Sequence, residues 1–116
     1  MKLATVRRHA LALPEIIEAP HFDYGSFRLR GGRMIATVPP GGELLHVFVP
    51  EDVREPALAM YPEFLEKLTW GAKAIGVRVR LPQADAAVVK RLLDQAWEAR
   101  APKKLLEAAK ARDPAA

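Results

Sequence analysis

Two stretches of this sequence alternate strictly between apolar residues and arginine, and this alternation constrains the fold more than any other feature. Arginine recurs two residues apart in both, at Arg28 and Arg30 within residues 26–30 and at Arg78 and Arg80 within residues 76–81. Because the side chains of a β-strand point alternately to its two faces, the arginines share one face and the apolar residues the other. The pattern predicts strands of an antiparallel sheet that is packed on one face and solvated on the other.

Turn signals divide the region after the first of these stretches into a meander. Gly31-Gly32 predicts a two-residue hairpin turn, since glycine accepts the positive φ that a type I′ turn requires. A return strand over residues 33–38 is expected next, then a longer turn over 39–42 and a third strand over 44–49. In that third strand His46 and Phe48 lie on the face opposite to its apolar residues.

Helical periodicity predicts helices on both sides of this meander. Apolar residues recur at helical spacing over residues 2–13, before Pro14, and again in a long helix that Asp85 caps at its start. Another helix is expected over residues 51–61, although Pro56 suits only a first turn, so this helix begins later or is irregular. The apolar stripe of the long helix consists of Val89, Leu92, Leu93, Ala96 and Trp97, and Pro102 interrupts it.

The remaining segments complete the prediction of the fold. Residues 15–23 are expected to form a connection or a short edge segment, and residues 64–68 a short strand followed by a loop with Trp70. We expect the Trp70 side chain to belong to the core. Strands that cluster apart from the helices predict an α+β fold, an antiparallel sheet with helices packed on one face. The 116 residues fit one such domain, residues 1–116.

The composition excludes several classes of protein and of site. The chain has no cysteine, which excludes disulfides and cysteine-ligated metals and indicates a cytoplasmic location. No apolar run approaches the roughly 18 residues of a membrane span, so we expect no membrane partner. Arg7 and Arg8 interrupt the segment where a secretory signal would need an apolar stretch. The net charge of +4 favours polyanionic partners.

No set of residues predicts catalysis. His9, His21 and His46 are widely spaced, and none has a histidine four residues away on a helix, so no metal site is predicted. Ser26 is the only serine, and no acid or oxyanion site accompanies it. We therefore expect no enzyme, no catalytic residue and no cofactor. A small-molecule or enzymatic pocket around His21 and Ser26 is the minor alternative.

Basic residues in two acid-free stretches are the candidates for a binding site. Residues 24–38 and residues 67–81 contain no Asp or Glu. The planar fork of an arginine donates two parallel hydrogen bonds to a phosphate, and Tyr24, Phe48 and Trp70 offer rings for stacking. The predicted contacts to nucleic acid, with DNA favoured, are Arg28, Arg30, Arg33, Lys73, Arg78 and Arg80.

Other interpretations of the basic residues stay open. Antiparallel sheets commonly have one solvated face, and arginine keeps such a face soluble. The sheet face or the Trp70 loop also suits a protein partner, in which case the chain is an interaction domain. A second basic cluster is a solvated helix end or a phosphate contact, and it comprises Arg100, Lys103, Lys104, Lys110 and Arg112. A monomer or weak dimer is expected.

Four short motifs follow one another along nearly the whole chain. They are residues 13–15 with 18–22, residues 26–31, Trp70-Gly71 before a strand that ends at Leu81, and Leu92-Leu93 with Ala96-Trp97 leading to residues 101–105. In these motifs and their order the chain resembles the MmcQ/YjbR-like family of small bacterial proteins. The resemblance implies an α+β, double-wing domain and a DNA-binding role, but it supplies no catalytic motif. His21, Phe22, Ser26, Phe27 and Arg28 match its signature positions.

Overall fold

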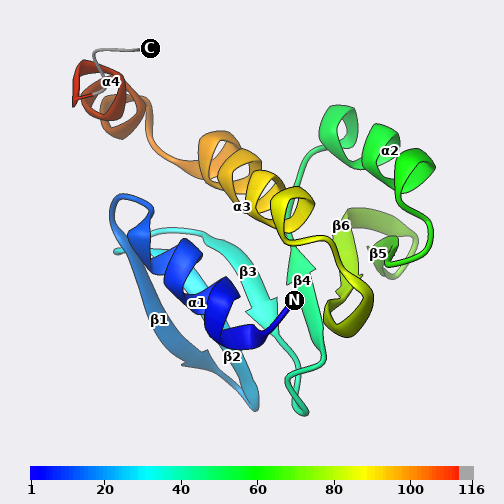
Figure 1. The fold of residues 1–116 in the computed structure, drawn as a ribbon. Coiled ribbons are helices and arrows are strands. Elements are labelled where there is room, and N and C mark those ends of the chain that lie inside the picture. Colours follow the sequence, from blue (N-terminus) through cyan, green and yellow to red (C-terminus); the bar gives the residue numbers. More distant parts are fainter. Residues whose placement is uncertain (113–116) are drawn as a thin grey trace.

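The meander predicted from the alternating pattern forms the middle of a larger sheet (Figure 1). In the computed structural model, which describes residues 1–112 apart from the side chain of Arg112, it consists of β2 (Tyr24–Leu29), β3 (Met34–Val38) and β4 (Leu44–Val47). The three strands pair antiparallel in chain order. The alternating residues therefore fold as the sequence predicts.

Three further strands extend the meander on both sides. Residues 15–23, expected to be a connection or edge segment, contain the edge strand β1 (Ile16–His21), which pairs with β2. The hairpin of β5 (Leu65–Trp70) and β6 (Lys73–Arg80) inserts β6 beside β4. The resulting six-stranded antiparallel sheet has the order β1-β2-β3-β4-β6-β5. Both arginine-bearing strands are thus in one sheet, separated by β3 and β4.

The connection between β2 and β3 is longer than the predicted two-residue turn. The backbone N–H of Leu29 donates to the carbonyl of Arg33, which encloses the three residues 30–32. Gly31 is left-handed with φ of 68°, whereas Gly32 does not have a positive φ. A type I′ turn needs positive φ at both central residues, so the prediction of that turn is wrong. The pair of strands is also irregular, with a register shift beside Arg28.

Within residues 1–112, three helices form where periodicity predicts them, and a fourth follows Pro102, where no separate helix was predicted. They are α1 (Leu3–Ala12), α2 (Glu51–Met60), α3 (Ala86–Arg100) and α4 (Lys103–Arg112). The Asp85 carboxylate accepts from the backbone N–H groups of Ala87 and Val88, which confirms the predicted N-cap of α3. Pro102 separates α3 from α4, as expected. Pro56 lies inside α2, which nevertheless begins at Glu51.

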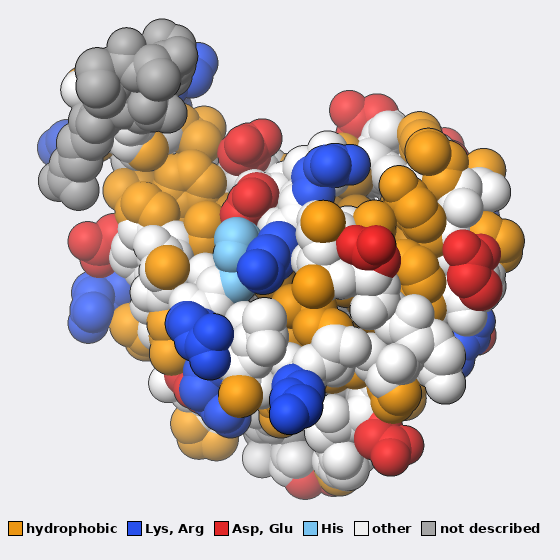
Figure 2. Space-filling view, viewed as in Figure 1, with side chains coloured by type: hydrophobic (Ala, Val, Ile, Leu, Met, Phe, Trp, Pro, Cys, Tyr) orange, Lys and Arg blue, Asp and Glu red, His pale blue; other side chains and the backbone are white. Residues whose placement is uncertain are grey.

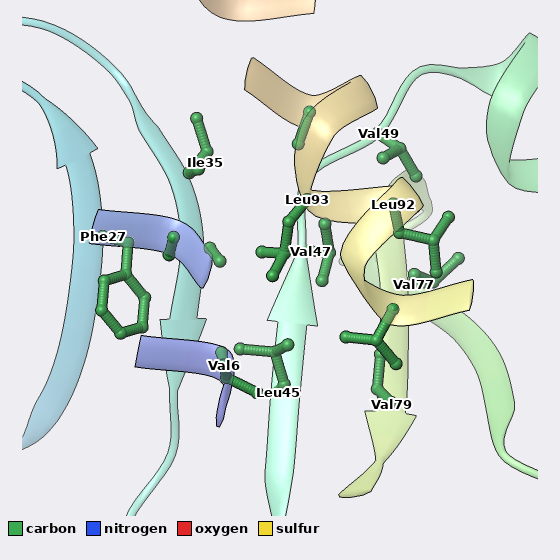
Figure 3. Close-up of a cluster of buried hydrophobic side chains, with 14 of the residues drawn as sticks. Val6, Phe27, Ile35, Leu45, Val47, Val49, Val77, Val79, Leu92 and Leu93 are labelled. Atoms are coloured by element: carbon green, nitrogen blue, oxygen red, sulfur yellow. The ribbon is translucent and has the colours of Figure 1, made fainter. Parts of the chain in front are cut away.

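A hydrophobic core fills the space between the sheet and the helices on one of its faces (Figure 3). Val47, Val77 and Val79 point from the sheet toward Leu92 and Leu93 of α3 (Figure 3). The predicted stripe of α3 is buried, and the indole N–H of Trp97 donates to the Pro14 carbonyl at 2.9 Å. The helices pack on one face of an antiparallel sheet, which confirms the predicted α+β fold class.

The helix-covered side of the molecule carries both signs of charge. Figure 2 shows Lys and Arg side chains interspersed with Asp and Glu over this side, with hydrophobic side chains gathered near α4. Within residues 1–112, no helix has the length and apolar character to cross a membrane. None of the helices in residues 1–112 covers the opposite face of the sheet (Figure 1), and Arg28 and Arg78 of the predicted binding residues lie on that face.

Candidate nucleic-acid interface on the open sheet face

A row of polar side chains crosses the open face of the sheet from β2 to β5. The strand register aligns Ser26, Thr37, His46, Arg78 and Glu66, one from each of five neighbouring strands. Arg78 donates from Nε to His46 Nε2 at 3.2 Å and from Nη1 to Glu66 Oε1 at 3.2 Å. The centre of the open face is therefore a hydrogen-bonded network rather than a row of free cations.

His46 is the most enclosed titratable group of this row, with 8% of its surface exposed. Burial lowers the pKa of His46 below 6.5, the Arg78 guanidinium lowers it further, and Glu66 opposes the change. The Tyr24 ring lies 6.1 Å from the imidazole, centroid to centroid. A neutral imidazole accepts the hydrogen bond that Arg78 donates, because the positive guanidinium disfavours a second charge beside it.

This lowered pKa predicts that stability decreases under mildly acidic conditions. The unfolded chain binds a proton at His46 near pH 6.5, whereas the folded chain resists it, so protonation favours unfolding as the pH falls. Urea denaturation is expected to show that the free energy of unfolding decreases between about pH 7.5 and 5.5, above the range where carboxyl groups titrate. This decrease should be smaller in His46→Gln. An NMR titration that gives His46 a pKa at or above 6.5 would contradict this prediction.

A hollow of about 680 Å³ lies beside the polar row, between the ends of two hairpins. The turn between β1 and β2 contributes His21 to Tyr24, and the end of the β5–β6 hairpin contributes Thr69 and Trp70. Its base includes the rings of His46 and Phe48. Aromatic groups thus line the hollow from both ends of the sheet, although they are far apart in the sequence.

Two of these aromatic side chains are almost fully exposed. Trp70 is 82% exposed at the end of β5, so the expectation that it belongs to the core is wrong. Phe22 is 93% exposed in the β1–β2 turn, and its φ of 57° lies in the left-handed region. Such a conformation costs a bulky residue about 1–2 kcal/mol, and no burial of the ring offsets this cost. Strained residues of this kind concentrate at binding and catalytic sites.

Arg100 at the end of α3 closes one side of the hollow. Its Nη1 donates to the Met34 carbonyl at 2.8 Å, and its guanidinium lies 5.0 Å from the centre of the Phe48 ring. Burial lowers the pKa of Arg100, and the neighbouring cation Arg33 lowers it further. No carboxylate of residues 1–112 forms an ion pair with this guanidinium, so its positive charge stays available to an anion.

Three of the predicted binding arginines have partners within the protein. Arg78 and Arg80 both approach Glu66, at 3.2 Å and 3.9 Å, and Arg80 also donates to the carbonyls of residues 62 and 63. Arg30 pairs with Glu15 at 3.3 Å. These acids lie outside the acid-free stretches of the sequence and reach the arginines through the fold. The partners reduce the net charge that these three arginines present.

The other three predicted residues lie at separate places. Arg28 is half-buried on the open face, and its Nε has no hydrogen-bond partner in residues 1–112. About three strand spacings, roughly 14 Å, separate its strand from that of Arg78. Lys73 is exposed opposite Trp70 in the β5–β6 hairpin, and Arg33 is exposed at the β2–β3 turn. The six cations are therefore spread over separate places of the sheet and its turns instead of forming one compact patch.

His21 and Ser26, the residues of the alternative small-molecule or enzymatic pocket, do not both line the hollow. His21 lines it and contacts the Phe22 ring edge-on, with the centroids 4.8 Å apart. Ser26 is fully buried, and its hydroxyl donates to the Ala19 carbonyl at 2.6 Å. Among the described residues, no three His, Asp or Glu side chains are close enough together to hold a metal ion.

The sequence interpretation did not assign Phe22 or Arg100 to the main binding site, although it gave phosphate contact as one alternative for the basic cluster that contains Arg100. Phe22 is in the turn of a hairpin whose first strand was expected to be a connection or a short edge segment, so Phe22 was not assigned to a turn. Arg100 was assigned to the basic helix end, because periodicity places it on α3 but does not show that it reaches β3. An aromatic residue followed by Asp23 and Gly25 is the one sequence feature that indicates a turn at Phe22.

Comparisons of the chain with protein-family models, with curated proteins and with solved structures found no match. The resemblance to the MmcQ/YjbR-like family therefore stays a prediction from the motifs.

Proposed function

We propose that this chain binds nucleic acid, single-stranded DNA in the first instance, in the hollow on its open sheet face. The observation that carries the proposal is the pair of exposed rings, Phe22 and Trp70, at the two hairpin ends that border the hollow. Bases stack on such rings in proteins that bind single strands, and every base has a face to offer. In a duplex the bases already stack on one another, so a single strand suits these rings better.

Cations around the hollow supply the contacts to phosphate. Lys73 lies beside Trp70, and Arg100 lines the hollow. Arg28 adds a buried Nε–H without an acceptor, and a buried donor of this kind calls for a water or a ligand. Arg30, Arg78 and Arg80 contribute less, because each already has a partner in the protein.

Fluorescence anisotropy with labelled oligonucleotides tests the proposal. The single strand is expected to bind more tightly than a duplex of the same length and sequence. If about three cations contact phosphates, affinity falls roughly ten-fold between about 50 and 150 mM salt, because each contact releases a counterion. An RNA strand of the same sequence serves as a parallel arm. Absence of binding to DNA and RNA even at low salt would refute the proposal.

A protein-interaction role is the second candidate, and the position of Trp70 favours it. Trp70 ends β5, which is an edge strand of the sheet, and exposed tryptophan is frequent among residues that dominate protein interfaces. In that case a protein partner would remain bound after nuclease treatment, and Trp70→Ala would release it. Neither oligonucleotide would bind the purified chain.

A further inference from the structure

A second groove lies between the β2–β3 turn and the C-terminal helix. Its volume is about 570 Å³, and its apolar lining includes Leu29 of β2 with Leu105 and Ala108 of α4. The turn and the start of α4 come from opposite ends of the chain, and the groove lies where they meet. Arg100 lines this groove as well as the aromatic hollow. The two depressions therefore share one side chain.

The charged residues of this groove are strongly unbalanced. Arg30, Arg33, Arg100 and Lys104 all line it, and Glu15 is its only acid. Glu15 pairs with Arg30 through a contact of 3.3 Å in which both side chains are more than half exposed. The other three cations have no carboxylate partner within residues 1–112. An anion from outside the protein would relieve their mutual repulsion.

The first turn of α4 adds to this imbalance. It begins with Lys103 and Lys104 and contains no acid. The N-terminus of a helix is the positive end of its dipole, so lysines there are unfavourable and a bound anion is favourable. Helix polarity and side-chain charge thus select the same kind of ligand in the same groove.

We propose that this groove binds the phosphates of a nucleic-acid strand whose bases occupy the aromatic hollow. The inference rests on the proposed function, since Arg100 would join the two sites along one strand. Arg33 and Lys104 hold the phosphates that extend beyond the hollow, and Leu29 and Leu105 form the apolar wall beside them. The groove therefore sets the length of strand that the protein binds.

The test compares two lengths of single-stranded DNA, one of about four and one of about twelve nucleotides, which span the site sizes of single-strand-binding modules. The long strand is expected to bind more tightly. The double substitution Arg33→Ala/Lys104→Ala is expected to weaken the long strand about ten-fold, to reduce its salt dependence, and to leave the short strand unaffected. Lys90→Ala/Arg91→Ala is the matched control, because it removes the same charge from α3 and neither residue lines the hollow or the groove.

The outcomes separate this inference from the proposed function. Equal affinity for both lengths, or equal weakening of both by the double substitution, would overturn the phosphate groove and leave the aromatic hollow in place. No binding of either length would overturn both proposals. Thermal melting of the variants checks that they fold, and NMR shifts at Gly31 and Gly32 on addition of inorganic phosphate provide a second measurement. A wild-type chain without such shifts would also count against the groove.

Discussion

Replacing Trp70 with alanine is expected to weaken binding of single-stranded DNA by roughly 5- to 150-fold, the effect of losing one base–aromatic stack of about 1–3 kcal/mol. The side chain is 82% exposed, so its removal costs little buried apolar surface and the free energy of unfolding should hardly change. Anisotropy titrations with one oligonucleotide at one salt concentration measure the first quantity, and urea denaturation measures the second.

Tryptophan fluorescence gives the same experiment an internal readout. The chain has two tryptophans, and Trp97 is 6% exposed in the core. DNA bound in the hollow is expected to quench the emission of Trp70 and leave that of Trp97 unchanged. In Trp70→Ala the quenching should disappear. Quenching that persists in this variant would contradict a stack on Trp70.

Phe22 allows a paired variant in which stability and binding change in opposite directions. Asparagine tolerates the left-handed conformation that Phe22 adopts, so Phe22→Asn is expected to stabilise the fold by about 1 kcal/mol. The same substitution removes a ring from the hollow and should weaken DNA binding. Met60→Ala is the control, because Met60 is an apolar side chain of α2 that is 66% exposed and lies outside the hollow. Equal effects of Met60→Ala and Trp70→Ala would indicate non-specific adhesion.

Local patterns in the sequence were sufficient to predict most of the fold. Alternation at Phe27 to Arg30 and at Val77 to Arg80 depends only on strand geometry, and the Asp85 cap depends only on the first turn of one helix. β1 was anticipated only as one of two alternatives, a short edge segment, because residues 16–21 do not alternate between apolar and polar types. It is a strand because it pairs with β2, from which only two residues separate it, and this pairing does not require alternation in β1 itself.

The candidate site was less predictable, because its properties depend on contacts across the sheet. Alternation correctly assigns Arg78 to the open face, but it does not reveal that Glu66 of the neighbouring strand lies opposite it. Trp70 was expected in the core from its residue type, yet the β5–β6 hairpin extends it away from the helices. Charge pairing and exposure are thus set by strand register and hairpin length, which the sequence does not show directly.

Gly76 is the position where a single methyl group is expected to damage the fold most. A Cβ built at Gly76 would lie 2.1 Å from the Val47 carbonyl oxygen, 3.0 Å from its carbon and 3.1 Å from the Phe48 Cα. Two of these atoms belong to the last residue of β4 and the third to the residue that follows it, and this backbone cannot move aside without disturbing the pairing of β4 with β6. Gly76→Ala is therefore expected to destabilise the protein by about 3 kcal/mol or more, at the upper end of overpacking effects.

Gly25 provides a matched control for this substitution. It also lies in a strand and lacks a positive φ, but its Cβ would meet only the Val38 side chain, at 3.8 Å, an ordinary contact distance. Gly25→Ala should leave stability unchanged or raise it by up to about 1 kcal/mol, since alanine restricts the unfolded chain more than glycine does. Urea denaturation of both variants measures the difference. Because small domains are stable by only about 5–15 kcal/mol, Gly76→Ala should unfold at a clearly lower urea concentration than Gly25→Ala. Similar urea midpoints for the two variants would mean that β4 lies less close to β6 than in the structure.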